Sequence, residues 1–379
     1  MTKYLFILKP LKPFFFGGEK SSFDMAEYFM QSRYFPQQTS ALGLVREHIL
    51  GIADLLGKTR TEIATCNRFI GAASFDGTFN AGAISKIGPV QIVKLSKENL
   101  PEDTLYYSNF DLLKLKTRSI AVNVNYGENN NVVKPDLILY DGEPPKIYDG
   151  KDHDLIEGRF ISGLDISCSF DASAKYDKML EETLAVKKIA PGGVFIKHVK
   201  AGNTKKYDGK DKINKDGFYK QVSYDLNQHY AFAFTIEIDE DKLNKNLAVK
   251  NKIMRFGGRA SSFSLSVEKG VDMPQFSPNV NGNKLLLLSD ALVDNSIYEN
   301  VTACITGTTT FRHAITSNSE AIYNKRLNKH YNGAKVYGSE RKCLLARGSV
   351  LISSHMTKTI KGFENSDYQN LGYNQTIQL

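Results

Sequence analysis

The chain has 379 residues and a formal net charge of +8, with 49 Lys and Arg against 41 Asp and Glu. Its composition, 41% hydrophobic and 24% charged residues, excludes an intrinsically disordered chain, and its length allows two domains with sizeable cores. The four cysteines have no C-x-x-C spacing, and the apolar start YLFILKPLKPFFF is interrupted by lysines and prolines. We therefore expect a cytoplasmic protein without disulfides, signal peptide or membrane span.

The first predicted elements are a strand, a long loop and a helix. Residues 4–11 have the pattern of a buried strand, and residues 14–38 form a long aromatic stretch that is typical of a functional loop or an insertion. Thr39 or Ser40 is a suitable N-cap for a helix over residues 41–56. That helix would turn five apolar residues inward: Leu42, Val45, Ile49, Ile52 and Leu56. Short strands follow, including 90–95 and 119–124, in the order of a ferredoxin-like half.

A basic hairpin is predicted in the middle of the chain. Residues 158–167 and 216–224 have strand patterns, and a long polar insertion separates them. From Ile196 to Lys220 the chain carries eight Lys and three Asp, an excess of five positive charges. Two strands around a basic tip predict a protruding β-hairpin, and the alternative is a solvated surface loop.

The pattern of the first elements then repeats. Residues 230–239 are predicted to form a strand, residues 240–254 a helix, and residues 262–267 a strand that buries Phe263, Leu265 and Val267. The helix would turn three apolar residues inward: Leu243, Leu247 and Ile253. Later strand-like runs are 284–290, 300–307 and 344–353. The chain is thus predicted to contain two βαβ-type halves joined by an inserted hairpin.

Three glycine-centred loops favour contact with a phosphate backbone: GGEK at 17–20, GGR at 257–259 and GYN at 372–374. Glycine lets a backbone come close to a ligand, and exposed amides and arginines donate hydrogen bonds to phosphate. In the second loop, Gly257 would end the predicted helix. Gly258, which has no side chain, would let RNA come close to the backbone. Arg255 and Arg259 would then flank the gap as phosphate contacts.

No catalytic, metal or cofactor site is predicted. The P-loop, dinucleotide-binding and RNA-recognition fingerprints are absent. His48 lies on the first predicted helix, but no second His, Tyr or Lys stands at a spacing that indicates a general acid–base pair. Arg46, Arg159 and Arg347 are candidate phosphate contacts, with surface ion pairs as the alternative.

Several segments together resemble the RAMP superfamily of CRISPR effector proteins, and most of all the subunit that holds the 5′ handle of the crRNA in type III-B (Cmr) complexes. The resemblance lies in five places along nearly the whole chain: KPLKPFFFGGE with FPQQTSALGLVR, GRFISGLD, GFYKQVSYDLNQHYAFAFTIEI, IMRFGGRASSF, and ARGSVLI with NLGYNQ. The chain differs in having Arg259 where an acidic residue often follows Gly-Gly, and G-Y-N instead of a glycine pair near the end.

The resemblance implies an α+β fold with two ferredoxin-like (RRM-like) RAMP domains and an inserted β-hairpin thumb. The expected bounds are 1–157 for the N-terminal domain, 158–225 for the thumb and 226–379 for the C-terminal domain. It also implies a non-catalytic, cofactor-free subunit that binds the crRNA 5′ handle. Its expected partners are the large polymerase/cyclase subunit, a backbone RAMP subunit and, indirectly, target RNA, with no membrane partner.

The loop at 17–20 and the start of the first helix are predicted to line one groove with residues 255–259 of the second half. The full set of predicted RNA-binding residues is Gly17, Gly18, Lys20, Arg33, Ser40, Arg46, Arg159, Tyr219, Lys220, Gln221, Arg255, Gly257, Gly258, Arg259, Ser261 and Arg347. The hairpin would displace or kink a nucleotide at the junction of handle and guide. Two other hypotheses stay open: a repeat-cleaving endoribonuclease of the same superfamily, and a scaffold that binds only proteins.

Overall fold

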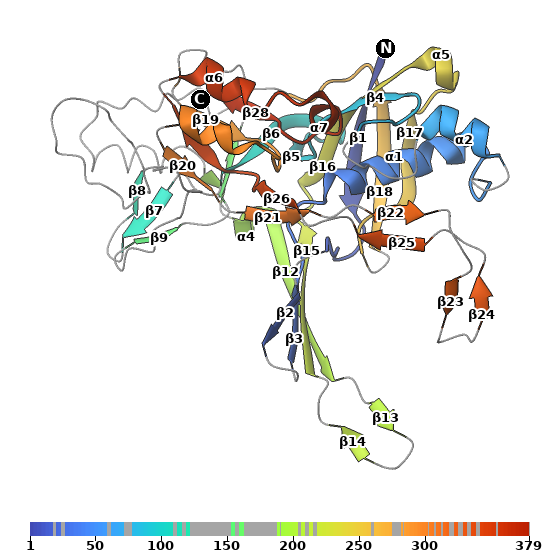
Figure 1. The fold of residues 1–379 in the computed structure, drawn as a ribbon, viewed down its shortest axis with the longest axis horizontal. Helices are drawn as coiled ribbons and strands as arrows, with labels where there is room; N and C mark the ends of the chain where they lie inside the picture. Colours follow the sequence, from blue (N-terminus) through green and yellow to red (C-terminus); the bar gives the residue numbers. More distant parts are fainter. Residues whose placement is uncertain are drawn as a thin grey trace.

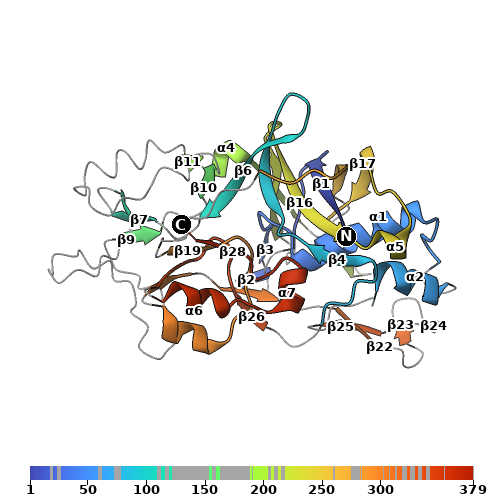
Figure 2. The same ribbon diagram turned by 90° about the horizontal axis from the view of Figure 1, so that it is seen from above.

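A computed structural model gives the fold of the chain (Figures 1 and 2). It describes residues 1–17, 20–23, 27–58, 62–71, 78–108, 112–115, 119–121, 153–155, 159–162, 188–189, 191–203, 206–208, 212–214, 218–258, 261–274, 282, 284–301, 303–306, 308–311, 314–317, 322–324, 329–331, 335–338, 342–353 and 355–378. The fold is α+β with antiparallel sheets, as predicted.

The largest sheet has nine strands. They are β1 (Thr2–Pro10), β4 (Ile84–Ile87), β5 (Gln91–Leu95), β6 (Pro101–Ser108), β10 (Arg159–Ser162), β11 (Lys188–Ile189), β16 (Tyr230–Ile238), β17 (Val249–Arg255) and β18 (Ser262–Lys269). Their order is β11-β10-β6-β5-β16-β1-β18-β17. The remaining strand, β4, pairs with residues 236–238 of β16, whereas β5 pairs with residues 230–233. β1 is antiparallel to both neighbours, with Phe6 opposite Phe234 and Val267. The strands predicted over 4–11, 230–239 and 262–267 are confirmed.

Helix α1 (Gln38–Ile52) packs on the apolar face of this sheet (Figure 1). Three of its predicted inward residues are buried: Leu42, Val45 and Ile49. The helix begins earlier than predicted, because Gln37 is its N-cap and not Thr39 or Ser40. It also ends earlier, so Leu56 lies beyond it and is 54% exposed.

His48 is a buried titratable residue on α1. Its Nε2–H donates to the carbonyl oxygen of Leu247 at 2.9 Å, and its Nδ1 lies 3.3 Å from Nζ of Lys252. Burial lowers the pKa of His48 and the charge of Lys252 lowers it further, while the bond to Leu247 opposes them. The folded protein therefore holds a neutral imidazole at this position.

We expect the free energy of unfolding to fall as the pH drops below about 6.5, the ordinary pKa of histidine. The folded-state pKa of His48 is lowered, so its contribution is complete above the unfolded pKa and is lost below it, because the unfolded chain binds the proton more readily. One such group changes stability by at most about 1.4 kcal/mol per pH unit. Urea unfolding between pH 7.5 and 5 should show a shallower fall for His48→Gln than for the wild type. His229→Gln, at an exposed position, should keep the wild-type slope.

A second sheet has four strands in the order β20-β27-β19-β28. They are β19 (Lys284–Leu287), β20 (Ala303–Ile305), β27 (Val350–Ile352) and β28 (Thr376–Gln378). The helices η1 (Asn295–Asn300) and α6 (Met356–Lys361) pack beside it, whereas α7 (Ser366–Asn370) contacts β4 of the largest sheet. Leu285, Leu287 and Leu351 pack with Ile297 of η1 and Phe363 in a cluster of their own.

The two sheets share one arrangement of strands. In the first, β1, α1, β5, β16 and β18 follow one another in the chain, and β1 lies between β16 and β18 with β5 beyond β16. In the second, β19, η1, β20, β27 and β28 follow one another in the chain. Here β19 lies between β27 and β28, with β20 beyond β27, and all three pairings are antiparallel. Strands β1 and β5 precede residue 157 while β16 and β18 follow residue 226. The strands of the largest sheet thus come from both sides of the segment 158–225.

Each sheet carries a β-ribbon: β12 and β15 lie in the chain between β5 and β16, and β21 to β26 lie between β20 and β27. The first arm is a four-stranded sheet in the order β12-β15-β3-β2, extended by a small hairpin. Its strands are β2 (Lys20–Phe23), β3 (Glu27–Gln31), β12 (Phe195–Asn203), β13 (Lys206–Asp208), β14 (Lys212–Asn214) and β15 (Phe218–Leu226). The second arm consists of β21 (Thr308–Phe311), β22 (Ala314–Ser317), β23 (Ile322–Asn324), β24 (Lys329–Tyr331), β25 (Lys335–Gly338) and β26 (Lys342–Leu345). Figure 1 shows both arms extending to the lower side of the molecule.

The predicted pairing of the hairpin is wrong. β15 confirms the strand predicted over 216–224, but its partner is β12, with Val199 opposite Val222. The strand that contains Arg159 is β10, which pairs with β6 and β11 in the largest sheet. Both candidate partners for β15 have strand patterns, and nothing local in the sequence distinguishes a near partner from a distant one.

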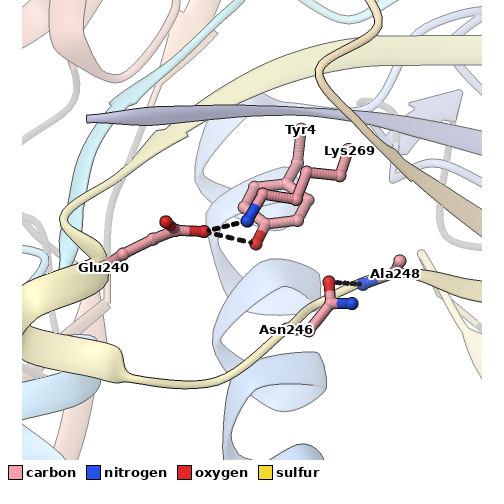
Figure 3. Close-up of polar contacts among 5 residues, drawn as sticks. All are labelled: Tyr4, Glu240, Asn246, Ala248 and Lys269. Carbon is pink, nitrogen blue, oxygen red and sulfur yellow. Dashed lines mark hydrogen bonds and ion pairs between the residues drawn. The ribbon is translucent and has the colours of Figure 1, made fainter.

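The predicted helix over 240–254 is also wrong beyond its first turn. Only α5 (Glu240–Leu243) is helical, because Asn244 then takes a left-handed conformation with φ 45°. The side chain of Asn246 accepts a hydrogen bond from the backbone amide of Ala248 at 3.0 Å, which turns the chain into β17 (Figure 3). Asparagine favours both conformations over a continued helix. Leu243 and Leu247 are buried as predicted, whereas Ile253 is 71% exposed on the strand.

A polar contact fixes the start of α5 to the largest sheet. Oε1 of Glu240 accepts hydrogen bonds from the hydroxyl of Tyr4 on β1 at 3.0 Å and from Nζ of Lys269 on β18 at 2.6 Å (Figure 3). The bond from Lys269, with those from Thr2 and Tyr4, lowers the pKa of Glu240 to about 2. The carboxylate therefore stays ionised across the neutral pH range.

The remaining elements are α2 (Ile63–Ile70), α4 (Pro191–Val194) and a three-stranded sheet of β7 (Leu112–Leu115), β8 (Ser119–Ala121) and β9 (His153–Leu155). No helix among the described residues is long and apolar enough to cross a membrane.

Candidate nucleic-acid interface

The first arm is anchored in a cluster of aromatic side chains. Phe14 lies 4.6 Å from Phe16 and 5.3 Å from Phe232 between ring centroids, and Phe16 lies 5.4 Å from Phe256. All four rings are at most 3% exposed. The backbone of Phe14 also pairs in both directions with Tyr224 of β15, with N···O distances of 2.6 and 3.1 Å. The base of the arm is therefore fixed to the core of the largest sheet.

The Gly-Gly pair forms the turn between β17 and β18, beside this cluster. Gly257 has φ 88°, and a Cβ there would lie 2.8 Å from the ring of Phe16 and 2.9 Å from the carbonyl oxygen of Phe15. The amide of Gly258 donates to that same oxygen at 2.8 Å. The hydroxyl of Ser261 accepts from the amide of Phe15 at 3.1 Å and donates to the carbonyl of Gly258 at 2.7 Å.

These contacts change the interpretation of the two glycines. Gly257 ends no helix, because β17 precedes it. The close approach of RNA was predicted at Gly258, whereas the group that comes closest to Gly257 is the chain itself, at Phe15 and Phe16. The hydroxyl of Ser261, also predicted to contact RNA, is used to hold the same loop.

The exposed surface of the first arm is basic. β12 forms one edge of the four-stranded sheet. Five consecutive side chains on it are exposed: Ile196, Lys197, His198, Val199 and Lys200. The two apolar ones, Ile196 and Val199, are 48% and 54% exposed. On the neighbouring strand, Nζ of Lys220 lies 5.9 Å from the ring centroid of Phe29, which belongs to β3.

Several predicted site residues meet at the base of this arm. Gly17 directly follows Phe16 and is exposed, with nothing within 4 Å of a Cβ built on it. The amide of Arg33 donates to the carbonyl of Phe16 at 3.0 Å, and its neighbour Ser32 donates to Val222 of β15 at 2.9 Å. The loop at 17, the turn at 257–258 and the strand with Lys220 and Gln221 therefore share one region, as the sequence predicted.

Other predicted residues are placed only in part. Gly18 and Arg259 lie outside the described residues. The backbones of Lys20 and Tyr219 belong to β2 and β15 of the first arm. Arg255 is exposed at the end of β17, opposite Ser262. Their contacts with RNA stay predictions.

Arg46 and Ser40 lie on α1. The guanidinium of Arg46 donates from Nε to the carbonyl of Ile70 at 2.9 Å and from Nη2 to that of Asn80 at 3.3 Å. Burial lowers the pKa of Arg46 to about 10, which still leaves it charged at neutral pH. Arg46 thus caps the end of α2, whereas Ser40 is exposed in the first turn of α1. A phosphate contact of either residue stays a prediction.

Arg347 lies inside the protein, between the two sheets. It is 6% exposed, its guanidinium carbon lies 4.0 Å from the ring centroid of Phe35, and Nη1 donates to the carbonyl of Val90. The predicted phosphate contact is therefore corrected, because no phosphate reaches a side chain enclosed in this way.

The glycine loop near the C-terminus also belongs to this internal contact. Gly372, Tyr373 and Asn374 are buried, and the side-chain amide of Gln38 donates to the carbonyl of Gly372 at 2.9 Å. With φ 86°, Gly372 brings its backbone against the start of α1. The loop therefore joins the two sheets and offers no open backbone to a ligand.

Arg159 is far from the other predicted contacts. Its strand β10 and strand β17 are separated by six steps across the largest sheet. At about 4.8 Å per step, this is roughly 29 Å. Arg159 therefore does not lie beside Gly257, while its strand pairs with β11, which precedes α4 and β12 in the chain.

Sequence reasoning missed two parts of this interface. The sequence prediction places residues 195–203 in a polar insertion, although the mix of apolar and basic residues in FIKHVKAGN is compatible with an edge strand. The hairpin β2–β3, inside the aromatic stretch 14–38, pairs in parallel with β15, with Phe29 opposite Lys220. Among the described residues there is no group of three His, Cys, Asp or Glu side chains that could hold a metal ion.

No family model and no curated protein matches the chain. Solved structures are similar to it along almost its whole length. A chain of the type III-B Cmr-beta complex bound to cognate target RNA and AMPPnP is 14% identical, with 98% of this chain and 95% of that chain covered and a TM-score of 0.48. Cmr-beta bound to cognate target RNA gives 14% identity, 99% and 96% coverage, and a TM-score of 0.45. A chain of the Csm3-Csm4 subcomplex of the type III-A CRISPR-Cas interference complex gives 12% identity, 93% coverage of both chains and a TM-score of 0.34.

Proposed function

We propose that this chain is a subunit of a type III CRISPR effector complex, of the III-B class, and that it binds the 5′ handle of the guide RNA. The observation that carries the proposal is the first arm, whose exposed strand β12 bears Lys197, His198 and Lys200 beside Ile196 and Val199. Exposed cations beside apolar side chains suit a ligand with a charged backbone and flat bases. The aromatic anchoring of the arm holds this surface in a fixed position.

The fold supports the proposal through its strand order. We infer that the two sheets are the cores of two ferredoxin-like domains, because each follows the order of the split βαβ unit, with its first strand between its third and fourth. The first arm corresponds to the predicted thumb, and its strands are β12 and β15 together with β2 and β3. In this arrangement the connection between β18 and β19 separates the domains.

The proposed partners follow from the sequence segments that resemble RAMP subunits. The chain would join the large polymerase/cyclase subunit to the first backbone subunit and would meet target RNA only indirectly. We propose no catalytic role and no cofactor. One co-purification tests the assembly: a guide RNA and a large partner should be recovered together with this chain.

The RNA-binding part of the proposal is tested with Lys197→Gln/Lys200→Gln. We expect the affinity for an RNA that carries the repeat-derived handle to fall about 25-fold at 0.1 M salt, and the slope of log K against log salt to become shallower by about 1.4. Each phosphate contact on a single strand contributes about 0.7 to that slope, and two contacts are removed. The measurement is a binding titration at several salt concentrations.

The matched control is Lys358→Gln/Lys361→Gln on α6. Both lysines are exposed, the change in net charge is the same, and Figure 1 shows α6 on the opposite side of the molecule from the first arm. The control should bind like the wild type. Equal affinities for the arm variant and the control would contradict the proposed interface.

The two other hypotheses predict different results. An endoribonuclease would cut repeat RNA at one site without metal, and a single His→Ala change would abolish the cleavage. A scaffold that binds only proteins would leave the RNA unprotected in footprinting. We expect protection of the handle and no cleavage.

A further inference from the structure

Strand β17 forms one edge of the largest sheet and pairs only with β18 among the described strands (Figure 2). The pairing slips between Val249 and Lys252. Within this bulge Asn251 has φ 54°, and its amide donates to the hydroxyl of Ser266 at 3.2 Å. A bulge is one of the features that keep an edge strand from pairing with a strand of another chain. The edge is therefore better suited to a ligand that is not itself a β-strand.

The exposed charges on this edge are all positive. Residues 245–258, all of which the structure describes, contain four Lys and Arg and no Asp or Glu. One of the four, Lys252, is half-buried, with its Nζ 3.3 Å from Nδ1 of His48. The other three are exposed and are called the edge cations below: Lys245, Lys250 and Arg255.

The edge cations differ from lysines elsewhere on the same sheet. Exposed lysines on β1, β5 and β18 are each paired with a carboxylate, at N···O distances of 3.3, 2.7 and 2.6 Å: Lys3 with Asp272, Lys94 with Glu102, and Lys269 with Glu240. None of the edge cations has a carboxylate partner in the part of the chain that the structure describes. Paired charges largely cancel each other's field, whereas unpaired charges of one sign add. The edge of β17 therefore presents a positive field to an anion.

Lysines on an edge strand can also serve only to prevent aggregation, which requires no ligand. That alternative accounts for the lysines but not for Ile253, which is 71% exposed between Lys250 and Arg255. An exposed isoleucine opposes protection from aggregation. A nucleic acid can use both kinds of side chain, because its phosphates meet the cations while a ribose or base contacts the apolar group.

The edge cations continue the surface at the base of the first arm. Arg255 lies opposite Ser262, whose carbonyl accepts a hydrogen bond from the amide of Leu11 at 2.9 Å. Two residues after Arg255, Gly257 lies against Phe16, which belongs to the aromatic cluster that anchors the arm. An RNA strand bound at the base of the arm therefore has β17 directly beside it.

We propose that the edge cations bind the sugar-phosphate backbone of the RNA strand that the first arm holds, so that this RNA continues along β17. The inference rests on the proposed function for the identity of the RNA. Contacts to phosphate carry no sequence information, so the edge holds the strand whatever its bases are. An acidic segment of a partner protein is the other class of ligand that cations suit, and the bulge at Asn251 disfavours its pairing with β17.

The test compares Lys245→Gln/Lys250→Gln with the wild type on two single-stranded RNAs of equal length. One RNA carries the repeat-derived handle, and the other has the same bases in scrambled order. We expect the affinity for both RNAs to fall about 25-fold at 0.1 M salt, and the slope of log K against log salt to become shallower by about 1.4, because two single-strand phosphate contacts are lost. The measurement is a binding titration at several salt concentrations.

The matched control is again Lys358→Gln/Lys361→Gln. The change in net charge is the same, both lysines are exposed, and Figures 1 and 2 place α6 away from β17. This control should bind both RNAs like the wild type. Thermal unfolding verifies that each variant is folded.

Each outcome decides the inference. An equal loss on both RNAs supports it, whereas wild-type affinity for both RNAs, or a loss confined to the handle RNA, overturns it. If RNA binding is unchanged while less of the large partner is recovered with the variant, the edge binds an acidic protein surface instead. If the wild type does not prefer the handle to the scrambled RNA, the proposed handle binding fails, while the comparison of the edge variant with the control still tests the edge.

Discussion

Replacing Gly257 with Ala is expected to reduce the free energy of unfolding by about 3 kcal/mol. At φ 88° an L-residue with a side chain is strained, which costs about 1–2 kcal/mol. The new Cβ would also lie 2.8 Å from the ring of Phe16 and 2.9 Å from the carbonyl oxygen of Phe15, both closer than real contacts allow. Forcing a group into a packed region costs a further 1–3 kcal/mol or so. Urea unfolding of the purified variant measures the loss.

Two neighbouring glycines supply the controls. A Cβ on Gly258 would meet the Phe15 oxygen at 3.3 Å, which needs only a small shift, so Gly258→Ala should lose clearly less stability than Gly257→Ala. Gly17→Ala should lose almost none, because its Cβ would enter open space. If Gly257→Ala were as stable as Gly17→Ala, the turn would not have the close contacts described above.

Replacing Arg347 with Ala is expected to destabilise the protein by about 3 kcal/mol and to weaken the contact between the two sheets. The change removes the guanidinium from the ring of Phe35, an interaction worth about 0.5–2 kcal/mol. It also leaves the carbonyl of Val90 without this donor, at a further 1–3 kcal/mol or so. Chemical unfolding of the variant, followed by fluorescence and circular dichroism, measures the effect.

Arg347→Lys separates charge from shape. Lysine keeps the positive charge but lacks the flat guanidinium that lies on Phe35, so it should recover little of the lost stability. The salt dependence of RNA binding should be the same for folded Arg347→Lys and the wild type, because the side chain is buried. A shallower salt slope would instead return Arg347 to the RNA-binding residues.

Local patterns predicted much of the largest sheet and failed where distant segments pair. The alternation of Phe263, Leu265 and Val267 identified β18, and the apolar runs at 4–11 and 230–239 identified β1 and β16. The hairpin partner of β15 was wrong because the nearer strand β12 was not predicted, and its other partner, β3, lies far away in the sequence. The helix predicted at 240–254 failed because asparagines at 244, 246 and 251 favour turns and left-handed conformations, which apolar periodicity does not register.

The candidate site could be predicted as a region but not residue by residue. The Gly-Gly pair indicates a backbone that another group approaches closely, yet composition cannot distinguish a ligand from the protein's own Phe16, which lies against Gly257. An arginine pattern likewise cannot distinguish exposed Arg255 from buried Arg347, because burial depends on how the two sheets meet. The basic charge at 196–220 could be predicted from the sequence, because the charge of exposed lysines does not depend on tertiary contacts.

The central position of β1 determines how the protein can be made. β1 leaves the ribosome well before its two hydrogen-bonded neighbours, β16 and β18, which begin at Tyr230 and Ser262. At about 5–20 residues per second, the ribosome needs roughly 10 to 45 s to supply the first of them. During that time the apolar segment YLFIL has no strand to pair with. Productive synthesis therefore depends on keeping the nascent β1 segment from aggregating until β16 and β18 have emerged.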